Sequence, residues 1–324
     1  MPLRPRHRLR LRLLPPSSSP TLRRLSSSSS LIRVTNIPAA SSGHIRLLEL
    51  NRPEARNAIS RALLADLGAE LDRVHAQYGR RGDELSAAVA AELGPTRALV
   101  LASAVDGCFC AGADLKERRA FTQLETAEFL SNLRATFTSL AHLPVPTISA
   151  ISSLALGGGL ELALSTHFRV LSSNATVALP ESRLAIIPGA GGTHRLPALI
   201  GLSRARDLIL TGRRVAAPEA YFLGIADRLV EVVPEDASPG PEGQRHDSSD
   251  LLPAARRAAL AEAVRLAQEI CEGGPVAIRA ALQALAWPSP EKEDEMYQRV
   301  VDTEDRNEAL KAFQDKRKPV FKGR

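Results

Sequence analysis

The segment that most constrains the fold is the uncharged run 144–160, which closes with three consecutive glycines, Gly157 to Gly159. Two prolines and three serines make this run too polar to cross a bilayer. It is also too short, because a spanning helix needs about 20 apolar residues. An apolar run that ends in glycines is instead typical of a buried strand leading into a turn. We therefore predict no membrane span here, but a strand at 147–152 and a helix that begins near Leu160.

Strand-like and helix-like segments alternate on both sides of this run. Short apolar stretches predict further strands at 44–50, 97–102 and 175–179. Apolar residues at helical spacing predict amphipathic helices at 60–76 and 124–142. Such an alternation favours an α/β architecture built in layers.

Three regions are predicted along the chain: a leader at 1–40, an α/β core at 41–250 and a helical region at 251–324. Glycine, proline and weak periodicity at 77–95 and 234–250 indicate exposed connections. No internal repeat is evident in the sequence. The helices predicted in the last region are 251–286 and 291–313.

The leader carries the excess positive charge of the chain. Residues 1–40 contain eight arginines and no acidic residue, which leaves 34 of the 42 basic residues to balance 36 acidic ones, a net charge of −2. A leader rich in Arg and Ser is typical of a mitochondrial transit peptide and predicts a location in the matrix. A basic tail without that role is the alternative. The net acidic remainder does not favour binding to DNA or RNA, and three cysteines are too few for a disulfide framework.

Two glutamates stand beside glycine-rich turns. Glu161 directly follows the glycine triplet and Leu160, and Glu181 precedes the glycine-rich stretch 188–193. A carboxyl group in an apolar pocket can keep a proton near neutral pH while a second one stays ionised, so two such groups can act as acid and base on one substrate. Either glutamate taken alone would be read as a solvated surface charge.

The glycine turns themselves can supply backbone N–H groups to an anion. The N–H of Gly158 lies where a helix is predicted to begin, and such groups have no partner within the helix. The turn at 108–116, which contains Ala113, is a second candidate. Two donors from separate turns are what an oxyanion hole requires. Close backbone packing is the structural alternative for the glycines.

Other catalytic chemistries lack their motifs. The sequence has no G-x-x-x-x-G-K-[ST] phosphate loop, no H-E-x-x-H pair and no G-x-S-x-G elbow. Cys108 and Cys110 form an isolated C-x-C pair, so zinc is not expected. His194 is interpreted as a structural or substrate-lining residue. We therefore predict no metal and no separate cofactor.

Four stretches combine these features in a recognisable order: 51–58, 109–117, 154–163 and 179–196. In sequence and spacing they resemble the enoyl-CoA hydratase/isomerase (crotonase) family, and the run 312–318 is similar to the end of that family. The resemblance covers about residues 42–324, and within the family it is closest to mitochondrial enzymes of the methylglutaconyl-CoA hydratase type. It implies a spiral of repeated β-β-α units and a C-terminal helical region that packs subunits into a homotrimer or homohexamer.

The resemblance also implies an activity and its residues. It places the N–H groups of Ala113 and Gly158 on the thioester oxygen of an acyl-CoA, and makes Glu161 and Glu181 the catalytic carboxyl groups of a hydratase. Coenzyme A is then part of the substrate. The residues implied to contact the CoA moiety or the substrate are Ala55, Arg56, Ala111, Asp114, Leu115, Lys116 and, from a neighbouring subunit, Phe313 and Lys316.

Hydration of a short or branched 2-enoyl-CoA, such as 3-methylglutaconyl-CoA, is the function that these residues favour. A Δ3,Δ2-enoyl-CoA isomerase is the main alternative, although it would need only one carboxylate. RNA binding through the helix at 60–76 and a non-catalytic scaffold are weaker alternatives. Ser152, Ser153, His167 and Ala185 depart from the common family pattern and bear on the substrate rather than on the reaction.

Overall fold

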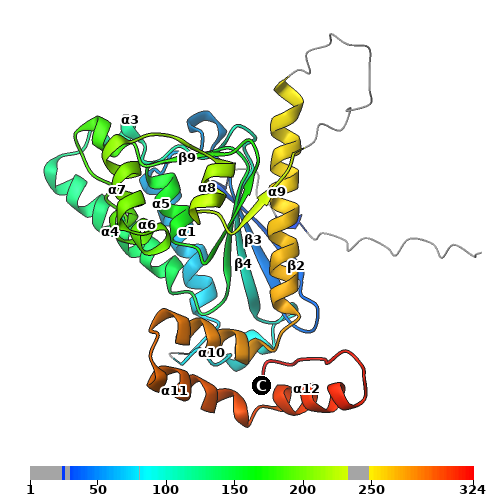
Figure 1. The fold of residues 1–324 in the computed structure, drawn as a ribbon. Coiled ribbons are helices and arrows are strands. Elements are labelled where there is room, and N and C mark those ends of the chain that lie inside the picture. The colour runs from blue at the N-terminus through cyan, green and yellow to red at the C-terminus, as the bar shows by residue number, and fades with distance from the viewer. Residues whose placement is uncertain (1–23, 26–29, 80, 233–247) are drawn as a thin grey trace, which may run out of the picture.

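The computed structural model describes residues 24–25, 30–79, 81–232 and 248–324. Helices and strands form the layered α/β architecture expected from the sequence (Figure 1). The strands of the described residues form one seven-stranded sheet, in the order β1-β2-β3-β4-β6-β8-β11, and one four-stranded sheet, in the order β10-β9-β7-β5.

The larger sheet is mainly parallel, and only β1 and β2 run antiparallel to their neighbours. Its strands are β1 (Arg24–Leu25), β2 (Ile32–Pro38), β3 (His44–Leu50), β4 (Thr96–Ser103), β6 (Thr147–Ile151), β8 (Phe168–Ser172) and β11 (Arg228–Val230). In the smaller sheet, the edge strand β10 is antiparallel to β9. Its strands are β5 (Cys108–Cys110), β7 (Leu154–Leu156), β9 (Thr176–Ala178) and β10 (Val215–Ala216).

A repeated unit generates both sheets. Three times in succession the chain adds a strand to the large sheet, then a strand to the small sheet, and then forms helices. The strand pairs are β4–β5, β6–β7 and β8–β9. The helices that follow them are α3 (Leu115–Arg118) with α4 (Gln123–Ala141), α5 (Gly158–Leu164), and the 3₁₀ turn η2 (Glu181–Leu184) with α6 (Gly192–Ile200) and α7 (Leu202–Thr211). This is the β-β-α spiral that the family resemblance implied. Sequence inspection missed the repeat because its helical parts differ in length and number.

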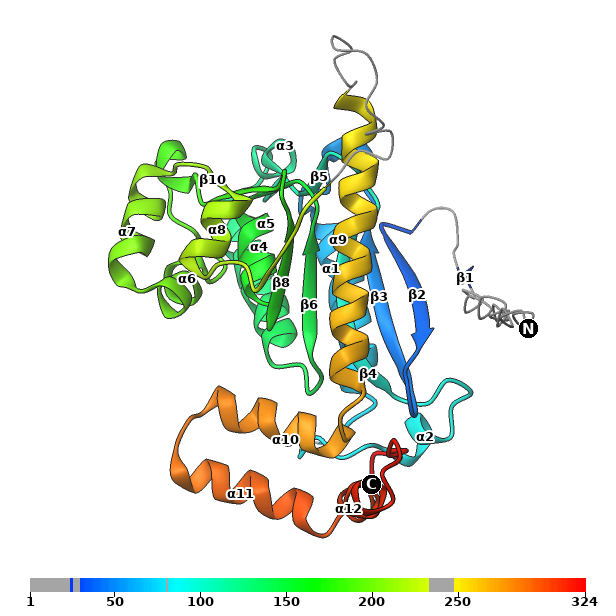
Figure 2. The ribbon, with the colours of Figure 1, turned by 45° about the vertical axis from the view of Figure 1, so that its right-hand side comes forward.

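Both faces of the large sheet are covered, which explains why β4 is buried at every position. On one face, Leu99 and Leu101 of β4 join the core formed with α1 (Arg61–His75) and α4. On the other face, Val100 packs with Ala259 and Ala263 of the long helix α9 (Ser248–Cys271). Alanines on this side of α9 let the helix lie close along the sheet (Figure 2).

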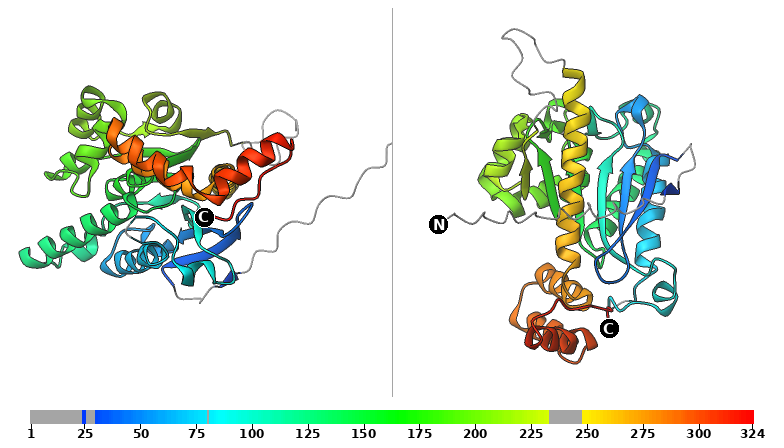
Figure 3. Two further views of the ribbon diagram at one scale, coloured as in Figure 1. Left: turned by 90° about the horizontal axis from the view of Figure 1, so that it is seen from below. Right: turned by 90° about the vertical axis from the view of Figure 1, so that its right-hand side faces the viewer.

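Three further helices lie beyond one end of the large sheet (Figure 3). They are α10 (Pro275–Ala286), α11 (Pro290–Val301) and α12 (Glu304–Gln314). A buried ion cluster attaches them to the body, because Glu84 accepts from Arg97 of β4 and from Arg279 of α10, the latter at 2.6 Å. The side chains of all three residues are at most 5 % exposed. The helix α8 (Ala217–Leu223) completes the fold between β10 and β11.

The structure changes two of the predicted boundaries. Residues 32–38 were assigned to the leader, yet they form β2, pair with β3 over its whole length and bury Ile32. The folded body therefore begins before residue 41, and residues 1–23 and 26–29 of the leader lie outside the described part. The predicted C-terminal helical region is present as α9 to α12, but its first helix begins at Ser248 rather than at Leu251 and covers the large sheet.

Smaller differences concern the connections and the last helices. The segment 77–95 contains the short helix α2 (Ser86–Val89), and the predicted helix at 251–286 is broken after Cys271. Of the connection predicted at 234–250, residues 234–247 lie outside the described residues. Among the helices that the structure describes, none is both long and apolar enough to cross a membrane.

Replacing Gly159 with Ala tests the closest backbone contact of the core. A Cβ there would lie 2.8 Å from the carbonyl carbon of Cys110 and overlap its oxygen, and a backbone cannot yield as a side chain does. We expect Gly159→Ala to lower the free energy of unfolding by about 1–3 kcal/mol. Gly68→Ala is the matched control, since its Cβ meets nothing closer than 3.9 Å and helix propensity favours alanine by about 1 kcal/mol. Denaturant unfolding of both variants decides, and equal stability would contradict the close contact.

Candidate active site

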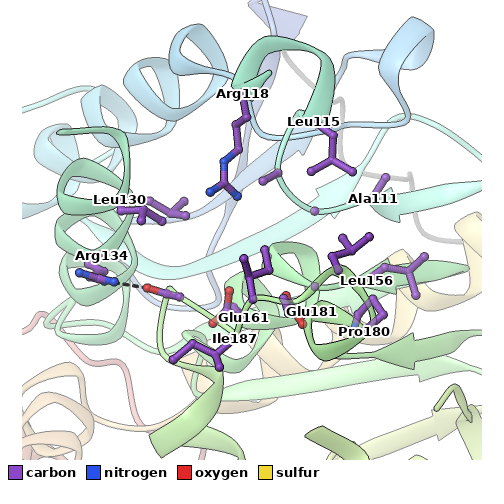
Figure 4. A pocket seen from close by; sticks show the side chains of 18 residues that line it. Ala111, Leu115, Arg118, Leu130, Arg134, Leu156, Glu161, Pro180, Glu181 and Ile187 are labelled. Carbon is purple, nitrogen blue, oxygen red and sulfur yellow. Dashed lines mark hydrogen bonds between the residues drawn. The ribbon is translucent and has the colours of Figure 1, made fainter. Parts of the chain in front are cut away.

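A pocket of about 560 Å³ opens between α3, α4, α5 and the turn η2 (Figure 4). Its lining is mainly apolar and its charged side chains are Arg118, Arg134, Glu161 and Glu181. Six residues predicted from the sequence line it together: Ala111, Ala113, Leu115, Gly158, Glu161 and Glu181. The structure thus brings both glutamates and both glycine-rich turns to one cavity.

The two candidate oxyanion donors are close neighbours. A Cβ built on Gly158 would lie 3.5 Å from the backbone nitrogen of Ala113. One built on Gly112 would lie 3.4 Å from the nitrogen of Gly158 and 2.7 Å from the carbonyl oxygen of Leu156. Gly112 has a φ of +94°, a conformation that side chains rarely adopt. Only glycine at 112 therefore permits the two turns to approach so closely.

Backbone pairing orients the N–H of Ala113. Ile59 donates to the carbonyl of Gly112 at 2.8 Å and accepts from the N–H of Asp114 at 3.1 Å. In this parallel bridge the N–H of the residue between, Ala113, is directed away from Ile59. Gly158 is the first residue of α5, where an N–H has no partner within the helix and the helix dipole favours negative charge. Both donors are thus available to an oxygen atom in the pocket.

Two backbone N–H groups donate hydrogen bonds to the carboxyl group of Glu161. Its side chain lies on α5, is buried, and its Oε1 accepts from Ala190 at 2.7 Å and from Gly192 at 2.9 Å. Burial raises the pKa of Glu161, while these two hydrogen bonds act in the opposite direction because they stabilise the carboxylate. The second oxygen is left for a ligand.

Glu181 is in a less polar setting. It is the first residue of η2 and is buried, and its Oε2 has no hydrogen-bond partner in the part of the chain that the structure describes. Burial raises the pKa of Glu181 to about 7, and the neighbouring charge of Glu161 adds to the rise. Because like charges disfavour joint ionisation, the pair retains one proton near neutral pH. Burial thus favours the protonated form of Glu181, whose Oε2 accepts no hydrogen bond from any residue that the structure describes.

The residues implied to contact CoA are only partly gathered at the pocket. Arg56 follows the 3₁₀ turn η1 (Pro53–Ala55), and its carbonyl accepts from the N–H of Ala111 at 3.1 Å, so Ala55 and Arg56 lie next to the oxyanion turn. The carboxylate of Asp114 caps α3 by accepting from Lys116 and Glu117, and pairs with Arg52 at 2.7 Å. Its side chain therefore has a structural role. The side chain of Lys116 is exposed.

Phe313 and Lys316 do not line the pocket of this chain. Phe313 belongs to α12 and is 85 % exposed, and Lys316 follows the end of that helix. Figure 1 shows α12 and α3 at opposite ends of the molecule. Their contribution from a neighbouring subunit stays a prediction.

Several features of the site were missed at the sequence level. Arg118 and Arg134 were not singled out, because helical charged residues give no signal of the direction in which they point. The N–H groups of Ala190 and Gly192 were noted only as part of a glycine-rich stretch. His194, considered as a lining residue, is exposed and absent from the pocket wall. Within the described ranges, no three His, Cys, Asp or Glu side chains gather as a metal site would require.

The helix considered for RNA binding is α1. Its arginines are engaged, since Arg73 pairs with Glu70 and Arg61 pairs with Glu125 at 3.3 Å. Paired guanidinium groups offer less charge to phosphate.

The family comparison agrees with this geometry. Residues 40–238, more than half of the chain, match the family model described as enoyl-CoA hydratase/isomerase. The chain belongs to the enoyl-CoA hydratase/isomerase family.

Relatives in this family resemble the chain over most of its length. A protein of Pyricularia oryzae named methylglutaconyl-CoA hydratase 1, mitochondrial, is 67 % identical, and the match covers 91 % of this chain and 87 % of that one. The human protein named methylglutaconyl-CoA hydratase, mitochondrial, is 37 % identical over 90 % of this chain and 77 % of its own. The crystal structure of an enoyl-CoA hydratase from Bacillus anthracis has a TM-score of 0.74 and 34 % identity, and the match covers 91 % of this chain and all of the other.

Replacing Glu181 with Gln tests its raised pKa through stability. A carboxyl group whose pKa is higher in the folded state stabilises that state below the ordinary pKa near 4.5, and the contribution is lost as pH rises to about 7. The free energy of unfolding of the native chain should therefore fall relative to that of Glu181→Gln, by about 3 kcal/mol between pH 4 and pH 8. Denaturant unfolding of both proteins across this range measures the difference. A difference that does not vary with pH would contradict the raised pKa.

Proposed function

We propose that this chain hydrates the 2,3 double bond of an enoyl-CoA thioester. The observation that carries the proposal is the convergence of two buried carboxyl groups and two backbone N–H donors on one mainly apolar pocket. Hydration of an enoyl thioester uses both the carboxyl groups and the N–H donors. The donors stabilise charge on the carbonyl oxygen, and the carboxyl groups move protons to and from the reacting carbons.

The N–H groups of Ala113 and Gly158 polarise the thioester carbonyl. This makes C3 of the conjugated acyl group electrophilic and stabilises the enolate that forms when water adds. The oxygen of water bonds to C3, and the electron pair of the double bond moves to the thioester oxygen. Collapse of the enolate then forms a bond from C2 to a proton. Removing one donor from such a site costs about 3–4 kcal/mol in the transition state.

The environments of the two glutamates assign the protons. The ionised carboxylate of Glu161, held by two N–H groups, accepts a proton from the attacking water. Glu181, with a pKa of about 7, is the proton donor to C2. Water has then supplied OH to C3, and the proton left on Glu161 restores that lost from Glu181 once the product leaves.

The finer substrate is an expectation from relatives. Proteins of Pyricularia oryzae and human carry the name methylglutaconyl-CoA hydratase, and 3-methylglutaconyl-CoA is our candidate among short and branched enoyl-CoAs. A relative from Zymoseptoria tritici, 56 % identical over 91 % of this chain, is named an enoyl-CoA isomerase/hydratase. Isomerisation, which moves a proton from C2 to C4 through a dienolate that the same two N–H donors would stabilise, is therefore the second candidate activity.

We also propose that the protein acts in the mitochondrial matrix. The arginine-rich, acid-free N-terminus and the mitochondrial names of these relatives support the location. Assembly into a homotrimer or homohexamer, and the lack of a separate cofactor, remain predictions from the family resemblance.

Removing either carboxyl group should nearly abolish hydration. We expect Glu161→Gln and Glu181→Gln each to lower kcat by about 10²–10⁴-fold, the usual contribution of a positioned acid or base. Loss of the conjugated enoyl-thioester absorbance of crotonyl-CoA measures the rate. Glu54→Gln is the matched control, because Glu54 is exposed and outside the pocket. Full hydration by Glu181→Gln would exclude the two-carboxylate mechanism.

The pH dependence should report the proton on Glu181. The donor is protonated below its pKa of about 7 and ionised above it. We therefore expect kcat/KM to fall as pH rises through about 7, since this parameter follows the free enzyme. Initial rates from pH 5 to pH 9 measure the profile. A rate that rises through this range would assign the base, not the acid, to Glu181.

A further inference from the structure

Two arginines line the catalytic pocket, and the hydration mechanism uses neither. Arg118 is the last residue of α3, and Arg134 lies on α4. The Nε of Arg134 donates to the carbonyl of Gly189 at 2.7 Å, and its charge lowers the pKa of Glu161. Arg134 thus already has a structural partner and an electrostatic one.

Arg118 has neither. Its side chain forms no ion pair, hydrogen bond or ring contact with any residue in the described part of the chain. The side chain is half-buried and points into the pocket above Glu161 and Glu181 (Figure 4). An unpartnered guanidinium in the wall of a mainly apolar pocket is available to pair with an anionic group of a ligand.

The position of Arg118 identifies which part of a substrate could compensate it. In Figure 4 the two glutamates lie between Ala111 and Leu156 on one side and Leu130 and Arg134 on the other. The thioester oxygen belongs at the first side, with the turn of Ala113. The acyl chain then passes the glutamates toward Leu130, and the guanidinium of Arg118 reaches down from above toward this path. A guanidinium presents a planar pair of donors that matches a carboxylate.

We propose that Arg118 binds a carboxylate at the far end of the acyl chain, so that the preferred substrates are dicarboxylic 2-enoyl-CoAs. Arg118 is then the specificity-determining residue of the site. This inference rests on the proposed hydratase function, but it concerns selection among substrates rather than the reaction.

A pair of substrates that differ only at the far end tests the proposal. Glutaconyl-CoA and 2-pentenoyl-CoA have the same chain length, and a terminal carboxylate in the first replaces a methyl group in the second. We expect the native enzyme to have the higher kcat/KM with glutaconyl-CoA. Arg118→Met should lower the ratio of the two kcat/KM values by at least about 30-fold, as expected when a desolvated charge loses its partner. Arg118→Lys should retain part of the preference, because it keeps the charge without the forked donors.

Arg119→Met is the matched control, since Arg119 is the next residue, is exposed and does not line the pocket. It should leave the ratio as in the native enzyme. Arg134→Met should lower both kcat/KM values by a similar factor, because Arg134 acts through Glu161 and Gly189. An unchanged ratio in Arg118→Met, or a ratio lost only in Arg134→Met, would overturn the assignment.

Binding of saturated esters separates this inference from the hydratase function. Glutaryl-CoA should bind the native protein more tightly than pentanoyl-CoA in calorimetry, and Arg118→Met should remove the difference. If Arg118→Met instead weakened both esters and free CoA equally, the guanidinium would bind the CoA moiety and the proposal would be wrong. If the native enzyme hydrated both enoyl-CoAs without preference, only the inference would fail. If it hydrated neither, the proposed function would fail.

Discussion

The close approach of two backbone turns is the constraint on which the site depends. The turn after β5 and the start of α5 come so near each other that a side chain at Gly112 or Gly159 would overlap neighbouring backbone. The parallel pairing of β5 with β7 brings these turns together, and glycine lets them touch. Two N–H groups from segments more than forty residues apart then face the same point. No side-chain rearrangement could replace this arrangement, because the donors belong to the backbone itself.

The same packing explains the unusual carboxyl groups. The turns and the apolar walls bury both glutamates, so an ionised carboxylate is costly unless the protein supplies donors. Glu161 accepts from two N–H groups at the start of α6, those of Ala190 and Gly192, whereas the buried oxygen of Glu181 accepts from none in any described residue. Two residues of identical chemistry thereby acquire different tendencies to ionise. The difference comes from backbone position, and therefore from the fold rather than from residue type.

Much of this was predictable from the sequence, for physical reasons. The strand at 44–50 and the helix at 60–76 were placed within about two residues, because a period of two or of 3.6 residues directly reflects burial on one face. The two glutamates and the turns of Ala113 and Gly158 were found from glycine spacing and the family motifs.

Other features depend on distant contacts that no local pattern reports. The strand β2 was hidden in an arginine-rich leader, since its seven residues carry no clear alternation and gain their structure by pairing with β3. The pocket arginines belong to helices whose orientation is set by tertiary packing. The sequence likewise did not show that α9 packs on the large sheet, because this depends on which face of the sheet is free to be covered.

The cluster of Glu84, Arg97 and Arg279 gives the C-terminal helices a different kind of attachment from that of the core. Apolar contacts are non-directional and allow two surfaces to slide, whereas one carboxylate shared by two guanidinium groups is satisfied in few relative orientations. The ion cluster therefore contributes more to the orientation of the C-terminal helices relative to the large sheet than to the free energy that holds them there. The C-terminal helices therefore keep one orientation relative to the strands. This fixes the direction in which their exposed aromatic side chains point, among them Trp287, Tyr297 and Phe313.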